Sequence, residues 1–207
     1  MTNREKYILS IYEELSDMGK HENVKLVKNT VNDGIYNYNI EIYKILKNRQ
    51  IKGIPKVYEI IEDEKELIII EEYIHGLTLD KKYNKTDVET VKKIMEQLCN
   101  ILKQLHNMNP PIIHRDIKPT NIIVSNDDVV YLVDFNISRE YDENQSVDTV
   151  IMGTQGYASP EQCGFAQTDC RSDIYSIGML MKNILMVDEY PDKETKSLKR
   201  IIDKCTS

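Results

Sequence analysis

The side chains best suited to chemistry lie in one short polar part of the chain. It begins with His114-Arg115-Asp116-Ile117-Lys118-Pro119-Thr120-Asn121, and Asp134-Phe135-Asn136 follows after an apolar, strand-like run. A carboxylate such as Asp116 can accept a proton, and Lys118 can neutralise an anionic group. The oxygens of Asp134 and Asn121 are the ligand type that Mg²⁺ prefers. The alternative is that Asp116 and Asp134 are loop carboxylates that only cap turns.

Two further segments follow in order, Gly153-Thr154-Gln155-Gly156-Tyr157-Ala158-Ser159-Pro160-Glu161 and Arg171-Ser172-Asp173-Ile174-Tyr175-Ser176-Ile177-Gly178. With the two motifs above, they resemble the catalytic loop, metal-binding motif, activation segment and following helix of eukaryotic-type (Hanks-type) serine/threonine protein kinases of bacterial appearance. The resemblance covers about residues 24–207 and is strongest between Leu67 and Gly178. It implies an α+β, bilobal fold, with a small antiparallel sheet and one helix in the N-lobe and a mainly helical C-lobe.

The resemblance implies a role for each polar residue of the two motifs. Asp116 would orient the substrate hydroxyl and accept its proton, while Lys118 would reach the transferring phosphoryl group. Asn121 completes the catalytic set and would hold Mg²⁺ together with Asp134. The implied cofactors are therefore ATP and Mg²⁺. His114 and Phe135 are expected to be packing residues.

The resemblance also names contacts to the adenine ring. In its register, the carbonyl of Glu72 and the N–H of Ile74 would hold the adenine edge. Ile123 would form the floor of the pocket and Val24 its roof. Judged by their side chains alone, Val24 and Ile123 can equally be ordinary core residues.

The same family resemblance indicates the class of substrate. Lys118 and Thr154 resemble the serine/threonine branch, and Ser159-Pro160-Glu161 resembles the end of a peptide-binding segment. These features favour ATP-dependent phosphoryl transfer to serine or threonine hydroxyls of a protein substrate. A pseudokinase that binds nucleotide or acts as a scaffold is the alternative, and a small-molecule kinase is a weaker one.

Arg115 resembles the arginine that pairs with a phosphate on the activation segment. Candidate phosphorylation sites are Ser138, Ser146, Thr149 and Thr154, and we favour Thr149. The alternative is that these hydroxyls belong to ordinary solvated loop residues.

The chain departs from the family pattern in its N-terminal part. The stretch Gly19–Val24 has one glycine where a glycine-rich loop would cradle phosphates, so the cradle is in doubt. Glu41 fits the place of the helix glutamate that pairs with a phosphate-binding lysine. Lys28, however, precedes the turn Asn32–Gly34, whereas the lysine belongs after the turn. We therefore expect Lys28 not to pair with Glu41, and Lys28→Met to change activity less than about tenfold.

Two departures concern later residues. Glu161 should pair with an arginine from a late helix, but the printed sequence stops at Ser207 before that helix. We therefore expect a C-terminally truncated domain or another partner for Glu161. Asn136 stands where the family has glycine, and asparagine tolerates left-handed backbone.

Apolar periodicity places these motifs on elements. Helices are expected over Glu5–Met18 and Ile40–Lys47, followed by a long one that begins at a Thr86/Glu89 capping box and ends before Pro110. Expected strands are Val24–Val27, Ile35–Tyr36, Val57–Ile61 and Leu67–Ile70. A boundary near Gly76 would separate an N-lobe, residues 1–76, from a C-lobe, residues 77–207.

Composition and charge indicate which partners and which cellular location the chain can have. The chain has 207 residues and a net charge of −7, which argues against nucleic acid or an anionic membrane as main partner. No apolar run is long enough to span a bilayer. Four cysteines without a Cys-x-x-Cys pair indicate reduced thiols and a cytoplasmic location. Oligomeric state is left open.

Overall fold

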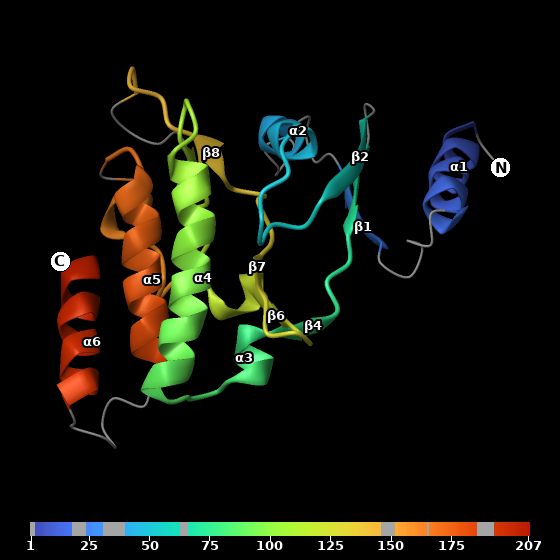
Figure 1. Cartoon of the computed structure of the whole chain (residues 1–207). Coiled ribbons are helices and arrows are strands. Elements are labelled where there is room, and N and C mark those ends of the chain that lie inside the picture. Colours follow the sequence, from blue (N-terminus) through green and yellow to red (C-terminus); the bar gives the residue numbers. More distant parts are fainter. Residues whose placement is uncertain are drawn as a thin grey trace.

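The computed structural model describes residues 3–17, 24–30, 40–62, 66–145, 152–164, 166–185 and 193–207. A small sheet with two helices forms the N-terminal lobe, and a helical lobe with short strands follows (Figure 1). The α+β, bilobal architecture is the predicted one, but the N-terminal lobe has two helices instead of the one that the family resemblance implied.

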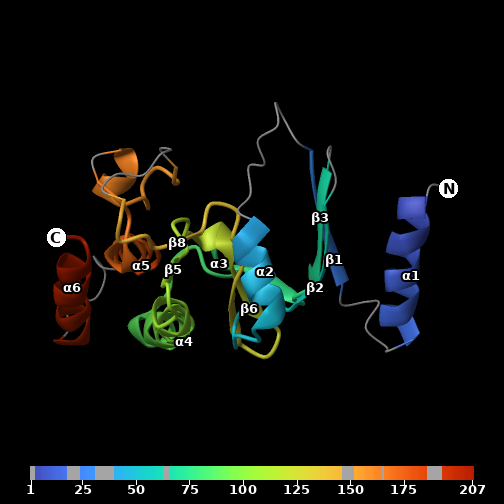
Figure 2. The same ribbon diagram turned by 90° about the horizontal axis from the view of Figure 1, so that it is seen from above.

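The sheet of the N-terminal lobe is antiparallel, with strand order β1-β3-β2. Its strands are β1 (Val24–Thr30), β2 (Val57–Glu62) and β3 (Glu66–Glu72). Helix α1 (Asn3–Asp17) lies on one side of this sheet and α2 (Ile40–Asn48) on the other (Figure 2).

The central strand β3 explains how both faces of the sheet are covered. Leu67 and Ile69 belong to the main core, whereas Ile68 and Ile70 pack against Ile8 and Ile11 of α1. Successive side chains of a strand point to opposite faces, so an unbroken apolar run serves a strand that is buried on both sides.

The C-terminal lobe is built around α4 (Val88–His106), which packs against α5 (Cys170–Ile184), with α6 (Lys193–Cys205) beyond it (Figure 1). A short helix, α3 (Leu79–Lys82), precedes α4. A second antiparallel sheet has the order β4-β6-β7, formed by β4 (Gly76–Thr78), β6 (Ile122–Ser125) and β7 (Val130–Leu132). Strands β5 (Ile112–Ile113) and β8 (Arg139–Glu140) pair separately, and the 3₁₀ turns are η2 (Pro119–Asn121) and η3 (Pro160–Cys163).

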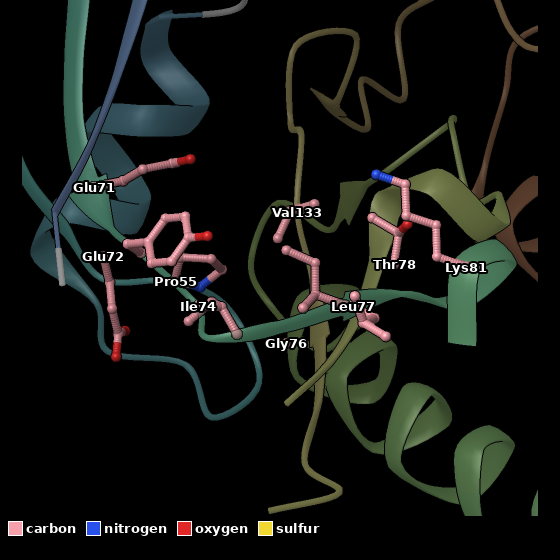
Figure 3. A pocket seen from close by; sticks show the side chains of 11 residues that line it. Pro55, Glu71, Glu72, Ile74, Gly76, Leu77, Thr78, Lys81 and Val133 are labelled. Carbon is pink, nitrogen blue, oxygen red and sulfur yellow. The ribbon is translucent and has the colours of Figure 1, made fainter. Parts of the chain in front are cut away.

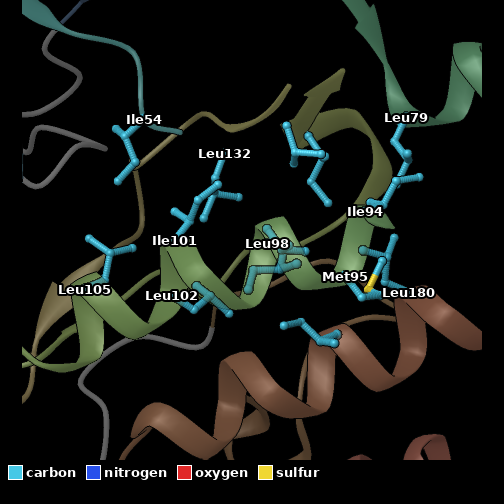
Figure 4. Packing of buried hydrophobic residues seen from close by; sticks show 14 of the residues in the cluster. Ile54, Leu79, Ile94, Met95, Leu98, Ile101, Leu102, Leu105, Leu132 and Leu180 are labelled. Carbon is cyan, nitrogen blue, oxygen red and sulfur yellow. The ribbon is translucent and has the colours of Figure 1, made fainter. Parts of the chain in front are cut away.

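One hydrophobic cluster runs through both lobes. The inward face of α4 supplies its centre, and Figure 4 shows Leu98, Ile101, Leu102 and Leu105 packed there. Ile42 and Leu46 of α2 and Leu67 of β3 belong to the same cluster. Burying a leucine or isoleucine side chain contributes about 1.5–3 kcal/mol, so this cluster holds the two lobes together.

Most expected elements are confirmed within one or two residues, but the start of the long helix is not. Asp87 is the N-cap of α4, and its side chain accepts hydrogen bonds from the N–H and the hydroxyl of Thr90. The hydroxyl of Thr86 instead donates to Asp87. The predicted Thr86/Glu89 capping box is therefore wrong, because the Asp87 carboxylate already accepts from the first turn.

Several predictions fall outside the described residues. They are the strand Ile35–Tyr36, the turn Asn32–Gly34, the glycine-poor stretch before Val24, and the candidate phosphorylation sites Ser146 and Thr149. None of the helices in the described ranges has the length and apolar character needed to cross a membrane.

Candidate active site

Asp173 of α5 fixes the start of the loop that carries Asp116. Its carboxylate is fully buried and accepts hydrogen bonds from the backbone N–H groups of His114 and Arg115, each at 2.9 Å. His106 of α4 places Nε2 2.8 Å from the same carboxylate. A buried charge needs such partners, and through them the helices of the C-terminal lobe hold the loop in place.

Asp116 is held through both of its carboxylate oxygens. The hydroxyl of Thr154 donates to Oδ1 at 2.6 Å, while Lys118 Nζ lies 2.7 Å from Oδ2 and the amide of Asn121 donates to Oδ2 at 2.9 Å. Lys118 also donates to Thr154 at 2.9 Å. The structure thus brings together Asp116, Lys118 and Asn121, and their side chains fix the direction of the carboxylate.

Asp134 lies beside Asn121. The N–H of Val133 donates to the backbone carbonyl of Asn121 at 3.0 Å, which sets the next residue, Asp134, against the same loop. Asp134 has a left-handed backbone, with φ of 68°. Its Oδ1 is buried and has no hydrogen-bond partner among the described residues. A buried carboxylate oxygen without a hydrogen-bond partner among the described residues fits a hard cation such as Mg²⁺.

Asn136 does not have the left-handed backbone that the glycine comparison suggested. Positive φ occurs two residues earlier, at Asp134, and Asn136 is absent from the positive-φ residues among those described. An asparagine at position 136 therefore causes no backbone strain.

His114 lies under this site as a packing residue. It has no exposed surface, and its ring meets Phe135 edge to face with a centroid distance of 4.7 Å. Nε2 lies 3.2 Å from the carbonyl of Val133, and Nδ1 accepts from the N–H of Asp116 at 3.3 Å. Only the neutral Nε2–H tautomer satisfies both contacts. Burial lowers the pKa of His114, against the carboxylates of Asp173, Asp116 and Asp134, which favour protonation.

A pocket of about 200 Å³ lies between β3 and the second sheet (Figure 3). The expected adenine contacts Glu72, Ile74 and Ile123 line it, and Val24 pairs with Glu72 in the strand register. Sequence reasoning missed the other lining residues, which are Pro55, Glu71, Tyr73, Gly76, Leu77, Thr78, Lys81 and Val133. Gly76 allows β4 to lie close against β6, because a Cβ at position 76 would lie 2.4 Å from the carbonyl oxygen of Val124.

The structure does not bring Glu41 into this site. Its side chain is 64% exposed and forms an ion pair with Lys44 of the same helix at 2.8 Å. Lys28 lies in β1 opposite Ile68 of β3, and both its side chain and the turn Asn32–Gly34 are outside the described residues. The Lys28 hypothesis therefore stays a prediction.

The structure also shows hydrogen bonds of Glu161 and Arg115, two residues that the sequence analysis expected to form ion pairs. Glu161 accepts a hydrogen bond from the hydroxyl of Ser172 at 2.7 Å, so it has another partner than the expected arginine. Arg115, a candidate phosphate ligand, has left-handed backbone and donates through Nη1 to the carbonyl of Ile137 at 3.4 Å.

Sequence reasoning missed two hydroxyls at the site. Thr154 was singled out as a family marker, but its bond to Asp116 spans 38 residues and requires the activation segment to fold back. Tyr43 of α2 contacts Asn136 and Phe135 over 93 and 92 residues. The apolar periodicity of α2 explained Tyr43 as a core residue, so no local signal pointed to its hydroxyl.

Comparison with known proteins agrees with this fold and site. The family model of the protein kinase domain matches residues 11–207, and the chain belongs to this family.

The similar curated proteins are kinases by name, and the bacterial ones are named as serine/threonine-protein kinases. A probable serine/threonine-protein kinase of Clostridium acetobutylicum is 35% identical over 131 residues, which cover 62% of this chain and 20% of that protein. Serine/threonine-protein kinase D of Synechocystis is 33% identical over 133 residues, covering 61% and 26%. Myosin light chain kinase 2 of Rattus norvegicus is 29% identical over 172 residues, covering 79% and 27%. The matched part of the chain spans 20–27% of the length of these relatives.

Proposed function

We propose that this chain transfers the γ-phosphoryl group of ATP to serine or threonine hydroxyls of a protein substrate. One observation carries the proposal: Asp116 is held through both oxygens by Thr154, Lys118 and Asn121. Residues 1–76 and 77–207 would act as the two lobes of one kinase domain.

In this proposal each side chain has a task in the transfer. Asp116 accepts the proton of the substrate hydroxyl and orients its oxygen, while the ammonium of Lys118 lies close enough to neutralise charge on the transferring group. Thr154 holds both side chains, because its hydroxyl donates to Asp116 and accepts from Lys118. Positioning of this kind supplies most of the rate in phosphoryl transfer.

Asp134 and Asn121 would hold Mg²⁺, which neutralises phosphate charge when bound. The buried, unpartnered Oδ1 of Asp134 supports this role. The adenine ring would enter the pocket beside Glu72, Ile74 and Ile123, with Val24 above it. A cytoplasmic location belongs to the same proposal and is supported by the scattered cysteines.

The pseudokinase alternative is favoured by one observation. Among the described side chains, Glu41 pairs with Lys44 within α2. A pseudokinase would bind nucleotide without transferring phosphate.

Asp116→Ala and Asp134→Ala test the proposal. Each variant should lose at least about a thousandfold in transfer from radiolabelled ATP to a serine/threonine peptide library, since Asp116 orients the nucleophile and Asp134 binds metal. Asp80→Ala, which removes an exposed carboxylate of α3, is the matched control. Circular dichroism on the same preparations should show unchanged folding.

Undiminished transfer by either variant would contradict the assignment. Binding of ATP by the wild type without any transfer would favour the pseudokinase, and label on phosphotyrosine alone would exclude the serine/threonine class.

A further inference from the structure

Helix α2 presents a tyrosine hydroxyl to the site, and its charged residues point elsewhere. Tyr43 is 4% exposed and shares the buried face with Ile42 and Leu46. Glu41 and Lys44 pair with each other on the outer face. Among the described residues, the polar contact from α2 to the metal-binding motif is therefore made by Tyr43.

The Tyr43 hydroxyl bonds to the two residues that follow Asp134. It donates to Asn136 Oδ1 at 3.0 Å and accepts from the backbone N–H of Phe135 at 3.2 Å. A phenol can donate one hydrogen bond and accept others, so a single group satisfies both contacts. Phe135 is 2% exposed, and water could hardly replace Tyr43 at its buried amide.

These bonds place Asp134 between two anchored amides. The N–H of Val133, before it, donates to Asn121, and the N–H of Phe135, after it, donates to Tyr43. Asp134 itself has φ of 68°, a conformation that costs a non-glycine residue energy and persists only where its surroundings hold it. The direction of the Asp134 side chain therefore depends on this backbone conformation.

We propose that Tyr43 is a positioning residue that couples the placement of α2 to the Asp134 carboxylate and thereby sets the Mg²⁺ requirement of nucleotide binding. The inference rests on the proposed function, since it concerns the metal that Asp134 would hold. When α2 shifts, the Tyr43 hydroxyl moves, the Phe135 amide loses its partner, and Asp134 is free to relax from the left-handed conformation.

Tyr43→Phe tests the coupling, because it removes both hydrogen bonds and keeps the packed ring. We expect the Mg²⁺ concentration for half-maximal binding of a fluorescent ATP analogue to rise about five- to thirtyfold, the range expected for losing a bond to a buried amide. Binding without Mg²⁺ should not change. Tyr83→Phe, which removes a half-buried hydroxyl next to α3, is the matched control and should leave both values unchanged.

A second readout needs no nucleotide. Hydrogen exchange measured by mass spectrometry should become faster in the peptide that holds residues 134–138 in Tyr43→Phe, and not in Tyr83→Phe. Asn136→Ala removes only one of the two bonds and should give a smaller effect in the same direction. Combined with Tyr43→Phe it should add nothing, because the bond it deletes is already lost. If Tyr43→Phe fails to fold, the Asn136→Ala measurement decides.

Each outcome has a distinct meaning. An unchanged Mg²⁺ requirement in folded Tyr43→Phe overturns the inference and leaves the proposed function intact. Equal increases in Tyr43→Phe and Tyr83→Phe would also overturn it, because the effect would then be one of general stability. Wild-type protein that binds no ATP in Mg²⁺ overturns the proposed function, and this is seen before any variant is made.

Discussion

A single proton at His114 ties the stability of the active-site loop to pH. The neutral ring accepts from the N–H of Asp116 through Nδ1 and contacts the carbonyl of Val133 through Nε2. Protonation of Nδ1 would break the first bond and place a charge inside the core. This is why burial lowers the pKa of His114 below its ordinary value of 6.5.

The free energy of unfolding should therefore fall as pH falls below about 6.5. Between pH 6.5 and the lower pKa of the folded protein, His114 binds a proton in the unfolded chain but not in the folded one. The free energy of unfolding therefore decreases over this interval as pH falls, by up to about 1.4 kcal/mol per pH unit. Urea titrations between pH 7.5 and 5 would measure the slope. His114→Phe should flatten it, whereas His75→Gln, at an exposed position, should keep it. Equal slopes in wild type and His114→Phe would contradict the prediction.

At the scale of single residues, the sequence predicted which side chains gather but not how they are held. Asp116, Lys118, Asn121 and Asp134 are close in sequence, so local spacing was enough to group them. Thr154 contacts Asp116 only because the chain folds back, and no apolar periodicity in the sequence predicts such a contact. Glu41 pairs with Lys44 on the exposed side of α2, and the sequence position of a helix residue does not say which face is buried.

At the scale of elements, the start of α4 shows the limit of motif matching. Thr86 and Glu89 fit a capping box by type and spacing, yet Asp87 accepts from Thr90 instead. Its bonds to the N–H and hydroxyl of Thr90 lower the pKa of Asp87 to about 2. A cap that is one residue later in sequence changes which side chain stabilises the helix.

Two substitutions distinguish the two caps. Asp87→Ala should lower the melting temperature by about 2–4 °C at pH 7, since it leaves first-turn donors unpaired. Glu89→Ala should have almost no effect, because the substitution keeps the backbone N–H and the Glu89 side chain does not take part in the cap. The Asp87 effect should shrink as pH falls below 3.8 towards about 2, where its carboxylate becomes protonated. A larger shift for Glu89→Ala than for Asp87→Ala would restore the capping box.

The remaining elements were more predictable because tertiary structure agrees with local pattern. Helix α4 and strand β3 follow their apolar periods closely. The short strands β5 and β8 have two residues each, too few for any period to be visible. Helix α1 was expected, but its packing on Ile68 and Ile70 depends on the second face of β3.

At the scale of the whole molecule, the continuous core implies that the two lobes unfold together. Side chains of α2 and β3 share one cluster with α4 and α5, so neither lobe keeps its core when the other is lost. Small domains with a shared core usually unfold in one cooperative step.

Whether the two lobes unfold together can be measured by tryptophan fluorescence, because the chain contains no tryptophan of its own. Tyr58→Trp in β2 and Tyr175→Trp in α5 each introduce one reporter at a half-buried position. Fluorescence of the two variants and circular dichroism should give the same urea midpoint once corrected for each variant's own stability. If the fluorescence of Tyr58→Trp changed at a lower urea concentration than the dichroism of the same variant, the N-terminal lobe would unfold separately.

The loop after α2 has a mechanical consequence. Gly53 has φ of 87°, its carbonyl accepts from the N–H of Leu132 at 2.8 Å, and a Cβ there would lie 2.5 Å from Ile101. The N-terminal lobe is thus attached to the C-terminal lobe at this contact and again where residues 73–75 join β3 to β4. These two attachments add to the core that the lobes share and to the hydrogen bonds of Tyr43. Twisting or sliding of one lobe against the other would therefore have to break the Gly53 hydrogen bond together with the core packing.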